Sequence, residues 1–422
     1  HQTVYSTSGK EFRLESGKDS VSVRLEASGS GPAAGVKVAK TLTFHRNSYL
    51  IDIAHELSNG SGSPIDTTAY FQLTRDGKPP AGDSKMVSTY TGGAVYTEQD
   101  KFHKVDFSDI DKNDKNKTPY KKNTDNGWVA LLQHYFVAAL LPPDKQPREF
   151  YTEKLAEDFY RVGSKLPIPT IAPGASSVVS VPLYAGPEEQ EKLKTIAPGL
   201  EFTVDYGWLT VIAAPLFWVL QYFHGWLENW GLAIILLTVV IKLIFFPLSA
   251  ASYKSMAKMK LVTQRMMKIR EQYANDRMKQ NQAMMDLYKE EKINPLGGCL
   301  PILVQIPVFI SLYWVLLASV ELRHAPFYGW ITDLAAEDPF YILPTLMMAS
   351  MIVQTRMNPT PPDPVQAKVM QIMPFAFGVM FFFFPSGLVL YWLVNNVLSI
   401  AQQWQITRMI EGGKAVTSGA KR

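Results

Sequence analysis

The pattern of polar and apolar positions divides the chain near residue 207. Before this point, short runs alternate between polar and apolar residues, as in 21–26 and 49–54, and clusters of Asn, Gly, Ser and Asp separate them. After it, long apolar segments alternate with short polar loops. Alternation is typical of strands with one buried face, whereas long apolar runs are typical of buried or membrane helices. We therefore predict an α+β chain in two parts: a β-rich domain over 1–207 and a polytopic helical membrane domain after it.

The N-terminal part shows further alternating runs over 36–38 and 42–44. Turn-forming residues punctuate it at Asn59-Gly60-Ser61-Gly62, Asp76-Gly77, Gly92-Gly93 and Asn126-Gly127. Short strands separated by such turns favour a β-sandwich. The lysine-rich segment 109–125 is predicted to be a solvated loop, and 186–200 a short charged helix that links this domain to the membrane.

Five segments have the apolar character of membrane spans, given that a hydrocarbon core about 30 Å thick needs roughly 20 helical residues. They lie near 231–250, 296–318, 340–356, 369–384 and 387–407. The fourth is short and ends in Phe384-Pro385-Ser386-Gly387, which indicates a tight turn between two spans.

Basic residues set the orientation, because Lys and Arg accumulate on the cytoplasmic side of membrane proteins. The segment 251–294 carries ten of them, and the tail 413–422 is also basic. The loop 319–340 holds four acidic residues against Arg323 alone. This assignment places 1–207 outside the membrane and the C-terminus inside.

An external N-terminal domain needs an export signal, yet the chain opens with His1-Gln2-Thr3 and shows no basic start followed by an apolar stretch. We expect that a signal anchor has been removed. Alternatively, 208–226 is itself a span, which would place the large domain in the cytoplasm. Its content of Pro215, Gln221, His224 and aromatic residues favours instead an amphipathic helix over 208–228 that lies in the interface.

Composition and motif content exclude a disulfide and several kinds of catalytic or cofactor site. The chain is 47% hydrophobic and 19% charged, and its net charge of +4 comes from the second part, where 18 Lys and Arg face 12 Asp and Glu. The single cysteine, Cys299, excludes an intrachain disulfide. We find no histidine pair at metal-ligand spacing and no Gly-x-Ser-x-Gly, Walker or dinucleotide motif. We therefore expect no enzyme, no metal or other cofactor, and no DNA partner.

Lys242 stands out because it lies inside the apolar run 231–250. A charge at mid-membrane costs roughly 2.5–3.5 kcal/mol on insertion scales, so such residues usually face a wet cavity or a partner. Thr238 and Ser249 fall near the same helical stripe. The simpler alternative is that the long side chain snorkels to the headgroups.

The last span carries a polar stripe, Tyr391, Asn395, Ser399 and Gln402, with Trp392, Asn396 and Gln403 on the adjoining face. Gln305 and Gln354 add polar groups in two other spans. If these side chains converge with Thr238 and Lys242, they line a hydrophilic recess open to the cytoplasm. The alternative is a set of interhelical hydrogen bonds that hold the bundle together.

The segment 251–294 predicts two antiparallel helices, because its apolar residues recur every three or four positions on either side of a break at Asn275-Asp276. Its methionines can adapt to varied apolar partners, and nearby basic residues could bind lipid headgroups or ribosomal RNA. The candidate contacts are Met256, Met259, Met266, Met285, Lys258 and Arg265. Alternatively, these methionines form only the seam between the two helices.

Several motifs, in this order along the chain, resemble the YidC-type membrane protein insertases of Gram-negative bacteria. They are 294–299 (NPLGGC), 319–323 (SVELR), 341–344 (YILP) and 384–392 (FPSGLVLYW). The resemblance covers essentially the whole chain, although the first transmembrane helix of the family has no counterpart here.

The resemblance implies a periplasmic β-supersandwich, a mobile cytoplasmic hairpin over 251–294 and a groove closed towards the periplasm. It also implies an inner-membrane location, nascent membrane proteins as substrates, and the ribosome and the Sec translocon as partners. Lys242 matches the position of the groove arginine, Thr238 a groove residue and Trp392 a substrate-contacting aromatic residue. Lysine keeps the positive charge but loses the bidentate fork of arginine.

The predicted function is insertion without covalent chemistry, in which a charged recess attracts the acidic tail of a nascent protein while its apolar segment enters lipid. A secondary transporter or channel for an anionic solute is the main alternative, although no internal repeat of the kind that transporters often show is visible. A carbohydrate-binding module on a membrane anchor is a third, which the polar stripes make less economical.

Overall fold

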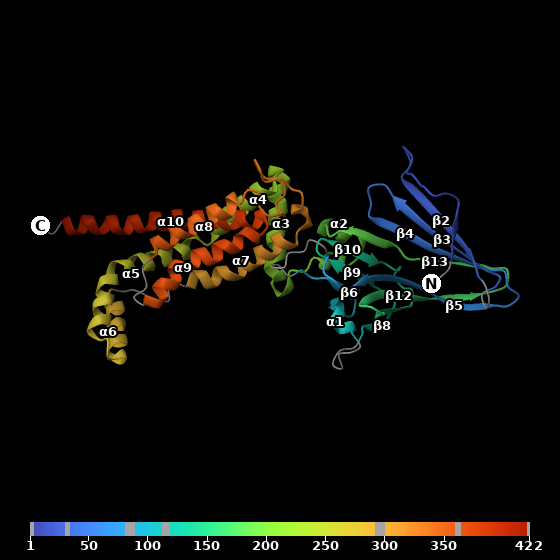
Figure 1. The fold of residues 1–422 in the computed structure, drawn as a ribbon, viewed down its shortest axis with the longest axis horizontal. Coiled ribbons are helices and arrows are strands. Elements are labelled where there is room, and N and C mark those ends of the chain that lie inside the picture. Colours follow the sequence, from blue (N-terminus) through green and yellow to red (C-terminus); the bar gives the residue numbers. More distant parts are fainter. Residues whose placement is uncertain are drawn as a thin grey trace. The chain divides into compact units, whose positions relative to one another are not determined.

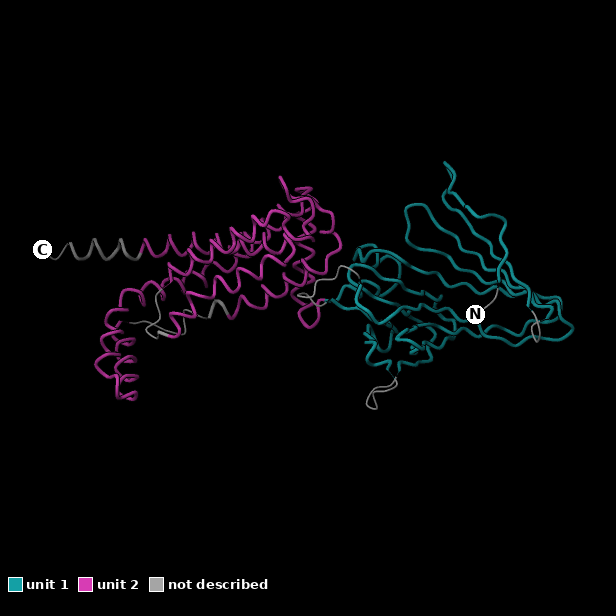
Figure 2. Tube along the Cα trace, viewed as in Figure 1, with its two compact units in different colours: residues 1–205 teal, residues 206–422 magenta. Residues whose placement is uncertain are grey.

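The computed structural model describes residues 4–29, 34–80, 89–111, 119–291, 300–358 and 364–419. Two compact units divide the chain, His1–Asp205 and Tyr206–Arg422 (Figures 1 and 2). The first is built mainly from strands and the second from helices, which confirms the predicted order of a β-rich part and a helical part. Cys299 and the motif 294–299 lie outside the described residues.

The first unit contains two antiparallel sheets. The larger has the order β1-β2-β3-β4-β14-β10-β9-β6-β7, with β13 also pairing with β4, and the smaller has the order β5-β12-β11-β8. The strands of the larger sheet are β1 (Ser6–Thr7), β2 (Ser20–Ser28), β3 (Val36–His45), β4 (Leu50–Asn59), β6 (Gly92–Thr97), β7 (Lys101–Val105), β9 (Trp128–Gln133), β10 (Phe136–Leu140), β13 (Ser176–Ser180) and β14 (Leu183–Pro187). Those of the smaller are β5 (Ile65–Asp76), β8 (Lys121–Thr124), β11 (Arg148–Lys154) and β12 (Phe159–Ile171).

Strand β9 shows how this unit is layered. Successive side chains of a strand point to opposite faces. Val129 and Leu131 join a core cluster that includes residues of the smaller sheet, whereas Trp128, Ala130 and Leu132 join a second cluster. The second cluster also contains Leu193 of α2 (Gln190–Ile196) and Leu200 of a 3-10 turn (Leu200–Thr203). Around β9, the larger sheet is therefore covered on one face by the smaller sheet and on the other by short helical segments.

Two local predictions in this unit were wrong. Gly92 and Gly93 do not form a turn but begin strand β6, where a side chain at Gly92 would run into the Tyr90 ring. Lys121–Thr124 is not a loop but strand β8, paired with β11. Glycine and lysine clusters predict turns only statistically, and tertiary packing overrides them here. The predicted helix within 186–200 is present as α2.

The second unit consists of helices. They are α3 (Thr210–Leu227), α4 (Trp230–Ile244), α5 (Phe246–Gln272), α6 (Arg277–Glu290), α7 (Leu300–Ala318), α8 (Ile342–Met357), α9 (Pro364–Met380) and α10 (Ser386–Gly419). Helix α10 contacts α4, α5, α7 and α8, so it connects the polar residues of several elements. A 3-10 turn (Phe381–Phe383) joins α9 to α10, where a tight turn was predicted.

The predicted span 231–250 is not one straight helix. Helix α4 ends at Ile244, and α5 begins at Phe246 with an axis bent by 67°. Pro247 lies in the first turn of α5, and proline lacks the N–H that would continue the hydrogen bonding of α4. Ser249 therefore lies beyond the bend rather than in the same helix as Lys242.

Membrane-spanning character, judged by length and composition among the described residues, is clearest for one helix, Val365–Phe383. The bent pair α4 and α5 passes the same test when taken together, and Leu303–Ala318 is a shorter apolar helix. The described residues of the predicted spans 340–356 and 387–407, which fall in α8 and α10, do not meet this criterion.

The loop between α7 and α8 closes one end of the helical unit. The Asp338 carboxylate, 1% exposed, accepts hydrogen bonds from Trp330 Nε1 at 2.9 Å and from the Leu343 amide at 2.7 Å. The amides of Ser386 and Gly387, at the start of α10, donate to carbonyls of the same loop. This end of the unit is thus held by a continuous hydrogen-bond network.

Candidate functional site

Lys242 lies in the last turn of α4 and is buried, with 4% of its surface exposed. Its ammonium donates a hydrogen bond to Ser399 Oγ of α10, and the Nζ–Oγ distance is 2.6 Å. The Ser399 hydroxyl donates in turn to the backbone carbonyl of Asn395 at 2.7 Å. Helices α4 and α10 therefore meet at one buried cation.

No carboxylate forms an ion pair with Lys242 among the residues that the structure describes. A lysine ammonium carries three donors, and Ser399 takes one of them. One turn further along α10, the Gln402 side-chain oxygen is buried and has no hydrogen-bond partner among the described residues. Buried polar groups are nearly always hydrogen-bonded, so this oxygen is an acceptor that is available to an additional partner.

Thr238 is fully buried one turn before Lys242. Its hydroxyl donates to the Ile234 carbonyl of its own helix at 2.7 Å. Thr238 and Lys242 are four residues apart in α4, so they lie on the same face of that helix. We call the predicted set of Thr238, Lys242, Asn395, Ser399 and Gln402 the α4/α10 recess; the contact that the structure shows within it between α4 and α10 is the hydrogen bond from Lys242 to Ser399.

The adjoining face of α10 serves a different purpose. Asn396 Nδ2 donates to Ser350 Oγ of α8 at 2.7 Å, and Gln403 Nε2 donates to Asn358 Oδ1 at 2.9 Å. For these two residues, the structure therefore shows interhelical hydrogen bonds, which the sequence analysis gave as the alternative to a hydrophilic recess. The polar residues of α10 therefore divide between the recess and the α8 contact.

Trp392 and Tyr391 belong to an aromatic cluster. The Trp392 ring stacks on Phe309 of α7 at 5.6 Å and meets Phe381 edge to face at 4.6 Å. Tyr391 is 2% exposed and also packs on Phe309. The Trp392 indole N–H is buried, and no described residue accepts a hydrogen bond from it. Gln305 and Gln354 are half-buried, and within the described residues neither side chain hydrogen-bonds to the recess.

The helices α5 and α6 form the predicted antiparallel hairpin, in which Val262, Met266 and Leu287 make a small core and Met259 packs against it. Asp276 caps α6 by accepting a hydrogen bond from the Lys279 amide at 3.0 Å. Met285 is 52% exposed, and Met256 and Lys258 are half-buried. Arg265 forms ion pairs with Glu290 at 2.8 Å and Glu291 at 2.6 Å.

Met278, outside the predicted contact set, is 84% exposed. The methionines therefore divide between the seam and an exposed surface, and Arg265 stabilises the hairpin itself.

The sequence pattern does not predict the burial of Asp338 and Arg148, which are 1% and 2% exposed. Asp338 is one of four acids in the polar loop 319–340, and Arg148 lies in a polar stretch. A lone acid or base in a polar segment carries no signal of burial, because the groups that satisfy it are backbone atoms brought together by folding.

Comparison with known families decides where this chain belongs. The family described as the YidC periplasmic domain matches residues 1–219, and that described as the 60Kd inner membrane protein matches 222–414. The chain belongs to the YidC family. These matches identify an inner-membrane protein with a periplasmic N-terminal domain.

Named members of the YidC family match this chain over its whole length. A protein of Nitrosospira multiformis named membrane protein insertase YidC is 60% identical over all of this chain and 73% of its own length. A protein of the same name from Dechloromonas aromatica is 58% identical over all of this chain and 76% of its own length. A crystal structure of an active YidC insertase aligns with 94% of this chain and 78% of its own, at 20% identity and a TM-score of 0.44. The transporter and glycan-binding hypotheses gain no support from these relatives.

Proposed function

We propose that this membrane protein insertase uses the α4/α10 recess to receive the polar tail of a nascent membrane protein. The observation that carries the proposal is the Lys242 ammonium, buried to 4% exposure and held by a neutral hydroxyl rather than a carboxylate. A charge without a counter-charge in a low-dielectric site attracts an anionic group strongly. An acidic residue in the arriving tail supplies that group.

In this mechanism the recess divides the free-energy barrier to moving a charged tail across the membrane into smaller steps. Burying an unpaired carboxylate in lipid is costly, whereas moving it to a site that already holds a cation and unpaired polar atoms costs less. The tail's carboxylate replaces Ser399 as the partner of Lys242. The apolar segment that follows then passes between helices into lipid, driven by its own transfer from water.

The proposed topology has five spans, with α3 in the interface, the β-rich unit in the periplasm and the C-terminus in the cytoplasm. The exposed indoles of Trp208, Trp218 and Trp226 suit a helix at the headgroup level. The closed end around Asp338 faces the periplasm in this arrangement, so the recess opens towards the cytoplasm and lipid.

The hairpin of α5 and α6 is proposed to meet the substrate first. Its exposed Met278 and Met285 offer adaptable apolar contacts, and its basic residues suit anionic headgroups or the ribosome. The ribosome and the Sec translocon are proposed as partners on the strength of family membership.

The decisive experiment measures insertion of a single-span substrate into vesicles that contain the full chain. The substrate's translocated tail carries two carboxylates, and a matched substrate carries the corresponding amides. Lys242→Glu should abolish insertion of the acidic substrate, whereas Lys242→Arg should preserve it. The amide substrate should respond to both variants much more weakly. Equal insertion of the acidic substrate by Lys242→Glu and the unaltered chain would refute the electrostatic step.

A further inference from the structure

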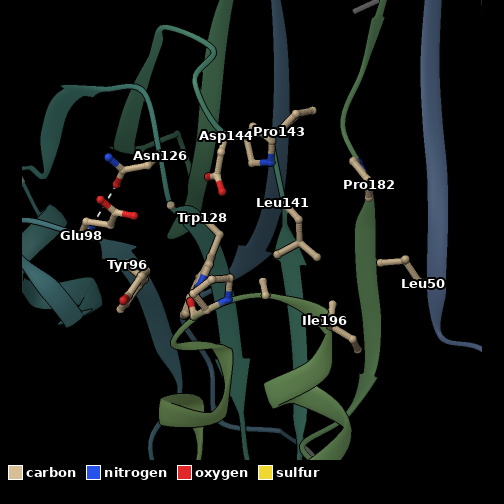
Figure 3. Close-up of a pocket in the computed structure, with 14 residues that line it drawn as sticks. Leu50, Tyr96, Glu98, Asn126, Trp128, Leu141, Pro143, Asp144, Pro182 and Ile196 are labelled. Atoms are coloured by element: carbon tan, nitrogen blue, oxygen red, sulfur yellow. Dashed lines mark hydrogen bonds between the residues drawn. The ribbon is translucent and has the colours of Figure 1, made fainter.

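The β-rich unit contains a pocket of about 250 Å³ on the face of the larger sheet that carries α2 (Figure 3). Its walls come from the start of β9, the loop 141–144 that follows β10, and residues 196–198 at the end of α2 and just after it. None of these residues takes part in the α4/α10 recess, so the pocket is a separate feature of the molecule.

The floor of the pocket is apolar. Leu50, Leu141 and Ile196 come from three different elements and face the same space. Pro142, Pro182 and Pro198 complete the wall, and proline has no backbone N–H to donate. Such a surface favours a bulky apolar group over a polar one, because few donors are available to replace lost water.

The rim of the pocket is acidic. Glu98 and Asp144 are both exposed there, and the lining contains no Lys, Arg or His. Asn126 Oδ1 accepts a hydrogen bond from the Glu98 amide at 2.9 Å, which fixes this side of the rim. These two exposed carboxylates favour a ligand with positive charge close to its apolar part, although the buried Arg148 guanidinium behind the rim offsets part of their negative potential.

A buried arginine holds the rim in place. Arg148 is 2% exposed, and its guanidinium donates to the carbonyls of Gly127 at 3.1 Å, Pro142 at 2.8 Å and Asp125 at 2.8 Å, and also to that of Pro143. These carbonyls belong to the two loops that flank the opening. A rim fixed before binding lowers the entropic cost of capturing a ligand.

The aromatic residues of the pocket are already engaged in packing within the unit. The half-buried Tyr96 ring stacks on Trp128 at 5.8 Å and 13°, and it also packs closely against Gly199. Trp128 is 2% exposed, and its Nε1 donates to the Pro198 carbonyl at 3.0 Å. Sugar rings bind by stacking on exposed aromatic faces, so this arrangement disfavours a glycan.

We infer that the pocket binds a bulky apolar side chain of an extended polypeptide segment that carries Lys or Arg nearby. The apolar side chain enters between Leu50, Leu141 and Ile196, and the basic side chains lie against Glu98 and Asp144. In an extended chain, residues two apart project to the same side, so Lys at positions two before and two after the apolar residue can reach the rim. The proposal does not depend on the mechanism of the recess.

The test uses the full chain in nanodiscs of zwitterionic lipid, with empty discs as the blank. The probe is a peptide of sequence Gly-Lys-Gly-Leu-Gly-Lys-Gly with a neutral fluorophore, and binding is followed by fluorescence anisotropy. Saturable binding that weakens at least about tenfold when Leu is replaced by Ala, or when both Lys are replaced by Glu, is expected. Added salt should weaken it further.

The matched variants change charge at exposed positions, so the fold is preserved. Glu98→Gln with Asp144→Asn should weaken binding about tenfold and reduce its salt dependence. Glu11→Gln with Glu15→Gln removes the same charge away from the pocket and should leave binding unchanged. Absence of saturable binding by the unaltered chain would overturn the proposal. Equal binding of the Lys and Glu peptides, or equal losses in the two pairs of variants, would overturn it as well.

Discussion

The Ser399 hydroxyl can accept a hydrogen bond from Lys242 but cannot neutralise its charge. A hydrogen bond that involves one charged partner is worth about 1.5–3 kcal/mol, less than a desolvated ion pair in good geometry. The partner is therefore strong enough to position the ammonium and weak enough to be replaced by a carboxylate. An acidic residue at position 399 would hold Lys242 permanently.

We predict that Ser399→Ala lowers insertion of acid-tailed substrates several-fold, because the ammonium loses its acceptor and its fixed position. Ser399→Thr keeps a hydroxyl and should retain activity. The vesicle assay with acidic and amide tails provides the measurement. Ser350→Ala is the control, since it removes a hydroxyl from the α8 contact without touching Lys242. If Ser399→Ala discriminates between the two tails as the unaltered chain does, Ser399 does not position the charge.

Gly127 gives a second prediction at this scale. Its φ is +84°, and a Cβ there would run into the Tyr96 carbonyl oxygen. Gly127→Ala should destabilise the β-rich unit by about 1–2 kcal/mol for the left-handed backbone and by at least about 1 kcal/mol more for the clash.

Gly174→Ala is the matched control, because its φ is +76° and nothing lies within 4 Å of the new Cβ. Hydrogen exchange of strand β9 in the full chain would measure how much stability each of the two variants loses. Similar protection in the two variants would show that the loop moves aside to accommodate the clash.

At the scale of elements, the hairpin of α5 and α6 separates structural from exposed methionines. Met266 lies in the seam at 3% exposure, and Met278 is 84% exposed. Met266→Ala should cost about 2–5 kcal/mol of local stability, the range for buried methionine. Met278→Ala should leave the fold intact.

The measurement combines hydrogen exchange of the hairpin with photocrosslinking to a ribosome-stalled nascent chain. Met266→Ala should speed exchange in α5 and α6. Met278→Ala should instead reduce crosslinks formed by probes on α6. Unchanged crosslinking, with the ribosome bound, would argue against a receiving role for the exposed methionines.

The elements were largely predictable because their causes are local. Alternation over 21–26 and 49–54 falls in β2 and in and just before β4, and the break at Asn275-Asp276 falls between α5 and α6. Strand β8 and the bend at Phe245 were missed, since the first depends on pairing with β11 and the second on one proline in an apolar run.

The candidate site was predictable only as a list of polar positions. Lys242 and Ser399 are 157 residues apart in the chain, so no spacing rule joins them. Likewise, nothing local separates Asn396, which bonds to α8, from Ser399, which bonds to Lys242. Which side of α10 meets which helix is decided by packing, and packing depends on residues distant in sequence.

At the scale of the whole molecule, the division into two compact units predicts two unfolding transitions with different pH dependence. In the β-rich unit, burial lowers the pKa of His55, and the nearby charge of Lys40 lowers it further. Between this lowered pKa and the ordinary value near 6.5, the unfolded chain binds more protons than the folded one. Stability therefore falls as the pH drops below about 6.5.

We expect the unfolding temperature of the β-rich unit to fall by about 1–3 °C when the pH is lowered from 7.5 to 5.5, because of His55. His55→Gln should remove that part of the shift. Calorimetry of the full chain at both pH values, with the transitions assigned by circular dichroism, provides the test. The same shift in His55→Gln as in the unaltered chain would assign the pH dependence to other groups.

Helix α10 continues without interruption for 34 residues, from the closed end of the helical unit to Gly419. At about 1.5 Å per residue this is roughly 50 Å, whereas a hydrocarbon core is about 30 Å thick. If α10 starts at the outer edge of that core, it projects about 20 Å beyond the inner edge. The helix then acts as a rigid spacer, which would hold any partner of the basic tail at a fixed height above the membrane surface.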